Sequence, residues 1–120
     1  MKNCFIFSGQ GSHRPGMSLN LYNTFQIAKD RIELSNKILG YDISEIMFSA
    51  EENVLRQTQY AQPAIFIHST ILFDLIKDQK ECVAVAGHSL GELSALYANN
   101  FFDFETGLKI VDVRARAMHE

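Results

Sequence analysis

Two short apolar runs, each stopped by a glycine, limit what this chain can fold into more than any other feature. The first covers residues 4–7, and the second covers residues 82–86 and ends at Gly87. Unbroken apolar runs of this length are typical of strands covered on both faces of a parallel sheet, because a helix needs more residues. The sequence therefore predicts two buried parallel strands, with Cys4 and Cys82 as buried thiols within them.

The rest of the chain has helical character. Gly40 is a stop signal for the first long helix, and Pro63 is predicted in the first turn of a long, mostly buried helix. Ser89 is predicted to begin one helix and Asp103 to N-cap the last. The expected helices before the second strand cover residues 23–39, 42–47, 51–56 and 60–77. This order predicts an α/β fold in which a short parallel sheet with right-handed crossovers is flanked by helices.

Composition restricts the function classes. The chain has 120 residues, 47% hydrophobic and 21% charged, with a formal net charge of -3 and both signs interspersed. No basic stripe is present, so we expect neither nucleic acid nor a membrane surface as a partner. No run approaches the roughly 18 apolar residues of a membrane span, and the start is too short for a signal peptide. The two cysteines lack metal-ligand spacing, and we expect a cytoplasmic location.

The segment at residues 87–91 reads GHSLG, a G-x-S-x-G pattern placed after a predicted strand and before a predicted helix. In that context the pattern predicts a nucleophile elbow, which holds Ser89 in a strained turn with its Oγ exposed. The backbone amide of Leu90 is then one oxyanion donor, and such a donor is worth about 10²–10³ in rate. The alternative is a serine N-cap in a tight strand–helix turn. The elbow interpretation predicts acyl-transfer chemistry at Ser89.

Four segments carry a family resemblance: FIFSGQGS at residues 5–12, QYAQPA at 59–64, GHSLGE at 87–92, and Arg114 with Met118. In this order and spacing the chain resembles, over its whole length, the malonyl-CoA:acyl carrier protein transacylases, whose superfamily includes the acyltransferase domains of polyketide and fatty-acid synthases. The resemblance implies that residues 1–120 are the N-terminal part of an α/β-hydrolase-like acyltransferase domain. The ferredoxin-like subdomain of that family is absent from the chain.

The resemblance also implies a reaction and its residues. Ser89 attacks the thioester of malonyl-CoA, holds a malonyl ester, and passes the group to the phosphopantetheine thiol of acyl carrier protein. No cofactor is implied, since malonyl-CoA is a substrate and the partner carries the phosphopantetheine. The amide of Gln10 is the second oxyanion donor, and Arg114 binds the malonyl carboxylate. Gln62 matches a family glutamine near the pocket, with a plain polar residue at a helix N-terminus as the alternative.

Helical periodicity separates Arg114 from its neighbour Arg116. At about 100° per residue, one apolar stripe predicts the buried face of the last helix, and Arg114 lies roughly 80° from its centre. Arg116 lies about 120° away on the other side, toward solvent. A planar guanidinium suits a carboxylate because it donates two parallel hydrogen bonds. The alternative for Arg114 is a structural salt bridge. The stripe consists of Phe104, Leu108, Val111, Ala115 and Met118.

Three departures from the family pattern stand out. His13 replaces the usual glutamine and is predicted to be a loop variation, with a catalytic base as the alternative, and Ser8 stands where proline is common. The third is the general base, which the resemblance places far downstream of the serine. The remaining histidines are not expected to replace it, because His88 points away from Oγ on an elbow, His68 is a satisfied core histidine and His119 lies at a helix end.

We therefore expect an N-terminal piece of a transacylase with little or no transferase activity alone, whose partner is the missing C-terminal part or a complementary chain. Two other functions are open. One is a serine esterase or lysophospholipase-type hydrolase that shares the elbow. The other is an inactive remnant that only binds carrier protein or another chain, through the edge of an unfinished sheet.

Overall fold

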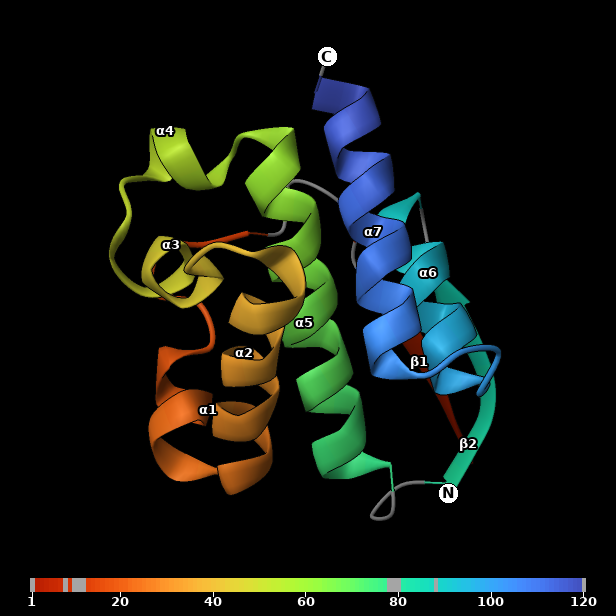
Figure 1. The fold of residues 1–120 in the computed structure, drawn as a ribbon. Helices are drawn as coiled ribbons and strands as arrows, with labels where there is room; N and C mark the ends of the chain where they lie inside the picture. Colours follow the sequence, from red (N-terminus) through yellow and green to blue (C-terminus); the bar gives the residue numbers. More distant parts are fainter. Residues whose placement is uncertain (1, 8, 10–12, 78–80, 88, 120) are drawn as a thin grey trace.

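The computed structural model describes residues 2–7, 9, 13–77, 81–87 and 89–119, with backbone only for residues 2–4 and 81–86. Within these ranges the fold is mostly helical and contains one two-stranded parallel sheet (Figure 1). In chain order the elements are β1 (Lys2–Phe7), α1 (Leu19–Thr24), α2 (Gln26–Leu39), α3 (Ile43–Ser49), α4 (Glu52–Leu55), α5 (Thr58–Ile76), β2 (Glu81–Gly87), α6 (Leu90–Ala98) and α7 (Phe104–His119). No helix in these ranges is both long and apolar enough to cross a bilayer.

The two strands occur where the apolar runs predicted them, and each is slightly longer. The prediction that both faces are covered was wrong for β1, since Ile6 is 79% exposed whereas its neighbour Phe7 is buried. The strands pair in parallel from Lys2 against Glu81 to Phe7 against Gly87, with one irregularity after Asn3. The side chains of both cysteines lie outside the described part of the structure. The helices α1 to α5 lie between the two strands in the sequence. The sheet therefore pairs the beginning of this segment with its end (Figure 1).

Two helix predictions were wrong in detail. The segment expected as one helix over residues 23–39 is broken at Phe25, whose backbone is extended at φ -120° and ψ 128°. The long helix α5 begins at Thr58 rather than residue 60, because the carbonyl of Gln57 already accepts hydrogen bonds from the amides that follow it. Pro63 therefore lies inside α5 and not in its first turn. The predicted N-cap at Asp103 is confirmed, since its carboxylate accepts a bond from the Thr106 amide at 2.8 Å.

Helix α5 forms the centre of the core, with α1 to α3 on one side and α6 and α7 on the other (Figure 1). Phe66 of α5 is fully buried and stacks on Phe104 of α7 at 5.8 Å between ring centroids. Gly107 allows the two helices this close approach, because a Cβ there would lie 2.7 Å from the side chains of Phe66 and Phe102. The buried positions of α5 are Ala61, Gln62, Pro63, Ala64, Ile65, Phe66, Ile67, Thr70 and Ile71.

A single carboxylate, that of Asp74 on α5, joins three helices. Its side chain is 5% exposed and lies 2.6 Å from Arg31 Nη2 of α2 and 3.2 Å from Lys77 Nζ. Tyr97 of α6 donates a hydrogen bond to it at 2.5 Å. Burial raises the pKa of Asp74, but the bond from Tyr97 and the cations Arg31 and Lys77 outweigh it and leave the pKa below its ordinary value.

This arrangement predicts a pH-dependent stability. Because the folded-state pKa of Asp74 is depressed, its contribution is present above the unfolded pKa of about 3.9 and is lost as pH falls through the folded value. Asp74→Asn is expected to lower the free energy of unfolding by about 3 kcal/mol at pH 7, since it leaves two cations without their buried partner.

The measurement is urea unfolding at several pH values, with Asp112→Asn as the control. Asp112 pairs with Arg116 on the surface, where such a pair is worth about 0.5 kcal/mol or less. The difference in free energy of unfolding between the wild-type chain and the Asp74 variant should disappear as the pH falls below 4. A difference that stays constant down to pH 2 would show that the ion pairs do not stabilise this junction.

Candidate active site

Ser89 occupies a strained turn between β2 and α6. Its backbone angles are φ 56° and ψ -117°, a combination that costs free energy for any residue with a side chain. The residue is exposed, and α6 begins at the next position, Leu90. A serine in a strained strand-to-helix turn is the backbone setting that the G-x-S-x-G pattern predicts.

Gly87 makes this turn possible. A Cβ at this position would lie 1.9 Å from the carbonyl oxygen of Gly91 and 2.5 Å from the amide nitrogen of Glu92. The first turn of α6 therefore folds back directly over the last residue of β2. Since the contact is between two backbone segments, no side-chain rotation can relieve it, and the position has to be glycine.

The first amide of α6 belongs to Leu90, whose side chain is fully buried. The first N–H groups of a helix have no acceptor within the helix and carry the positive end of its dipole. This placement leaves the Leu90 amide available beside Ser89, and its role as an oxyanion donor stays a prediction. Gln10 and His88 lie outside the described residues, so the second oxyanion donor and the direction of His88 stay predictions too.

Arg114 of α7 connects two of the predicted site residues. Its Nη2 donates to Ser89 Oγ at 3.2 Å, and its Nη1 donates to Gln62 Oε1 of α5 at 2.5 Å. No ion pair among the described residues involves Arg114, which disfavours a structural salt bridge. Arg116 is exposed and bonds Asp112 at 3.0 Å, as the helical periodicity predicted. One guanidinium on α7 thus connects a side chain of α5 with the serine of the turn before α6.

The site contains a contact that the sequence did not predict. Gln62 is fully buried within α5, and its Nε2 donates to Met118 Sδ at 3.2 Å. Met118 was expected in the buried stripe of α7, but it is 54% exposed, whereas the other four members of the stripe are buried. That prediction was wrong because the last turn of α7 leaves the core, as residues 116–119 are all exposed.

The three described histidines have hydrogen-bond partners or surroundings other than Ser89 Oγ. His13 Nε2 is 3.3 Å from Glu52 Oε1, and His119 is exposed at the end of α7. His68 is hydrogen-bonded as predicted, with its Nδ1 2.6 Å from Ser18 Oγ, but it is half-buried in the wall of a cavity rather than in the core. Burial lowers the pKa of His68, so its ring is neutral at pH 7. None of the three is hydrogen-bonded to Ser89 Oγ.

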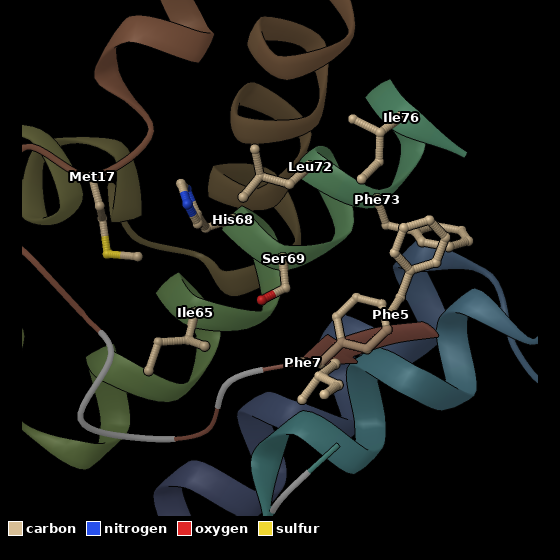
Figure 2. Close-up of a pocket in the computed structure, with 10 residues that line it drawn as sticks. Phe5, Phe7, Met17, Ile65, His68, Ser69, Leu72, Phe73 and Ile76 are labelled. Carbon is tan, nitrogen blue, oxygen red and sulfur yellow. The ribbon is translucent and has the colours of Figure 1, made fainter. Parts of the chain in front are cut away.

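A separate cavity of about 340 Å³ lies between β1 and α5 (Figure 2). His68 and Ser69 supply most of its polar groups, and the remaining walls are apolar. Its lining does not include Ser89, Gln62 or Arg114. The residues that line it are Phe5, Ile6, Phe7, Met17, Ile65, His68, Ser69, Leu72, Phe73 and Ile76. Among the described residues, no cluster of His, Cys, Asp and Glu side chains is suited to hold a metal ion.

Comparison with known proteins identifies the family. The family model described as the acyl transferase domain matches residues 4–120. The chain belongs to the acyl transferase family. A malonyl CoA-acyl carrier protein transacylase of Synechocystis sp. is 43% identical over 119 residues, covering 98% of this chain and 40% of the relative. A polyketide biosynthesis malonyl CoA-acyl carrier protein transacylase of Bacillus subtilis, PksC, is 39% identical over 117 residues, covering 95% and 39%.

Solved structures of the family agree with the fold. The crystal structure of a Synechocystis malonyl-CoA:ACP transacylase has a TM-score of 0.93 at 42% identity, covering 99% of this chain and 40% of that protein. A malonyl-transacylase in complex with a polyketide acyl-carrier protein has a TM-score of 0.89 at 31% identity, covering 96% and 38%. This acyl transferase chain therefore spans about two fifths of the length of these relatives.

Proposed function

We propose that this chain carries the nucleophile and the carboxylate-binding group of a malonyl transferase site. In this proposal Ser89 takes the malonyl group from malonyl-CoA and passes it to the phosphopantetheine thiol of acyl carrier protein, in fatty-acid or polyketide synthesis. The observation that carries the proposal is the position of Arg114, one hydrogen bond from Ser89 Oγ. A malonyl group has a free carboxylate one methylene group away from the carbonyl under attack, and a guanidinium is a good partner for it.

The reaction has two half-steps through one ester. Ser89 Oγ attacks the thioester carbonyl, loses its proton to a base, and the carbon–sulfur bond breaks to release the CoA thiol. The amides of Leu90 and Gln10 stabilise the negative oxygen of the intermediate. The phosphopantetheine thiol then attacks the ester carbonyl, the bond from that carbon to Ser89 Oγ breaks, and the proton of this thiol passes through the base to Oγ. Through both steps Arg114 holds the carboxylate, exchanging its bond to Oγ for bonds to the substrate.

The general base is the part of the site that the described residues do not supply. Arg114 can only donate, and none of the three described histidines contacts Ser89 Oγ. A serine without a base is a weak nucleophile at neutral pH. We propose that the base belongs to the remaining three fifths of the relatives' length, which would also include the ferredoxin-like subdomain of an α/β-hydrolase-like domain.

The names of the relatives support the substrate and the partner. Malonyl CoA-acyl carrier protein transacylases recur among the similar proteins, and one of them is named as a polyketide biosynthesis protein. One similar solved structure contains a transacylase together with an acyl-carrier protein.

The direct test is to incubate the chain with radiolabelled malonyl-CoA, with and without imidazole, and to locate the ester by proteolysis and mass spectrometry. We expect a slow malonyl ester on Ser89 that imidazole accelerates by acting as the missing base. Acylation faster than about 1 s⁻¹ without imidazole would be in the range of complete enzymes, and it would contradict the proposal that this part of the site has no general base. A folded chain that takes up no malonyl group even with imidazole would overturn the proposed function.

Arg114→Ala separates a malonyl transferase from a serine hydrolase with the same elbow. Removing the guanidinium removes charge-assisted hydrogen bonds worth about 1.5–3 kcal/mol, so malonyl labelling is expected to fall about 10–100-fold. Labelling by acetyl-CoA, which has no free carboxylate, is expected to stay within about threefold.

The measurement is competitive labelling of the variant with malonyl-CoA and acetyl-CoA, with Arg116→Ala as the control. Arg116 lies on the same helix but faces solvent, and its variant should keep the preference of the wild-type chain. If labelling of the Arg114 variant falls equally with malonyl-CoA and with acetyl-CoA, the hydrolase interpretation is favoured.

A further inference from the structure

Neither core packing nor the proposed reaction accounts for the methionine at position 118. It lies in the last turn of α7, outside the core, and most of a long apolar side chain is left in solvent. Its sulfur nevertheless makes a defined contact, because it accepts a hydrogen bond from Gln62 Nε2 at 3.2 Å. The partner is the same amide whose oxygen accepts from Arg114.

The Gln62 amide has two orientations of nearly equal shape, with oxygen and nitrogen exchanged. A guanidinium can only donate a hydrogen bond, and a thioether sulfur can only accept one. The observed orientation satisfies both neighbours, and the reversed one would place NH₂ against the guanidinium and oxygen against sulfur. Because Gln62 is fully buried, it is poorly placed to use water as a substitute partner. Arg114 and Met118 together therefore define the orientation.

We propose that Met118 is a positioning residue for the carboxylate-binding site. By accepting from the Gln62 amide, its sulfur keeps the amide oxygen toward Arg114 and thereby holds the guanidinium beside Ser89. The hydrogen-bonded series runs from Met118 Sδ through Gln62 and Arg114 to Ser89 Oγ. The part of this inference that concerns malonyl selectivity rests on the proposed function.

Met118→Leu is the substitution that isolates the sulfur. Leucine keeps the apolar bulk and the helix propensity, but it cannot accept a hydrogen bond. The buried NH₂ of Gln62 then has no acceptor, so one of the two contacts that define the amide orientation is lost and Gln62 holds Arg114 less firmly. We expect malonyl labelling in the presence of imidazole to fall about tenfold, with acetyl labelling changed by less than about twofold.

Two further variants make the test specific. Met118→Gln supplies a carbonyl oxygen that can accept from Gln62, so it should recover most of the malonyl preference. Met47→Leu is the matched control, because Met47 is fully buried in α3 and undergoes the same chemical change. A second readout needs no substrate: the side-chain NMR signals of the Gln62 amide and the Arg114 guanidinium, compared among the folded variants.

The inference is supported if Met118→Leu moves both NMR signals and lowers the malonyl-to-acetyl ratio, while Met118→Gln restores them and Met47→Leu changes neither. Unchanged Gln62 and Arg114 signals in Met118→Leu would overturn it, as would equal changes in Met47→Leu. If the wild-type chain shows no malonyl preference but Met118→Leu still moves the two signals, the proposed function fails and the orienting role of Met118 stands.

Discussion

A chain in which Ser89 is replaced by alanine is expected to take up no malonyl group at any imidazole concentration. The alanine cannot form an ester, and the other serines of α6 and α5 lack the strained, exposed setting of residue 89. The measurement is the radiolabel retained after denaturation of the variant. Ser94→Ala is the control, because Ser94 lies on the same helix but is fully buried, and its variant should be labelled like the wild-type chain. Label retained by the alanine variant would place the nucleophile elsewhere.

Replacement of Ser89 by cysteine tests whether the site lacks a base that removes the proton of the nucleophile. A few per cent of an ordinary thiol is ionised at pH 7, so cysteine depends less on a base than serine does. Ser89→Cys is therefore expected to form a malonyl thioester faster than the wild-type chain forms its ester without imidazole. Its rate should rise about tenfold per pH unit below the thiol pKa of about 8.5. A variant slower than the serine chain would show that position, rather than activation, limits acylation.

The Gly87→Ala variant is expected to lose more than about 4 kcal/mol of stability, which is exceptional for one methyl group. The new Cβ would lie 1.9 Å from the Gly91 carbonyl oxygen, so the end of β2 and the start of α6 have to separate. Since the total stability of a domain is about 5–15 kcal/mol, the variant should be largely unfolded or have lost the elbow. Urea unfolding followed by circular dichroism measures the loss.

Gly40→Ala distinguishes this collision from a general intolerance of glycine replacement. Gly40 follows α2 with φ +80°, and a Cβ there would contact nothing within 4 Å. Only the left-handed backbone opposes alanine at this position, at a cost of about 1–2 kcal/mol. Comparable losses in the two variants would mean that the close approach of α6 to β2 is not the constraint at Gly87.

The local part of this molecule could be predicted from the sequence. The elbow around Ser89 and the N-cap at Asp103 depend on residues a few positions apart, so the pattern contains the whole cause. The face of Arg114 on α7 also followed from periodicity, because the angle between residues of one helix is fixed. The break at Phe25 could not be predicted, since the apolar residues on both sides continue the same helical period.

The contacts between elements could not be predicted from the sequence, for a different reason. Periodicity assigned Met118 to the buried stripe because it gives an angle around the helix and says nothing of where the core ends. The bond between Gln62 and Arg114 depends on how α5 and α7 are aligned along their lengths. The junction at Asp74 joins residues of three helices that no local pattern connects, and only the folded chain brings them together.

The pairing of β1 with β2 has a consequence for the order of folding. Lys2 pairs with Glu81, so the first strand has to wait for its partner while five helices are synthesised between them. At 5–20 residues per second that delay lasts on the order of several seconds, long enough for α1 to α5 to collapse onto one another. Closing so long a loop is entropically costly, and contacts of this separation form late. The turn that holds Ser89 follows the second strand, so the nucleophile is expected to reach its working geometry only after α1 to α5 have packed together.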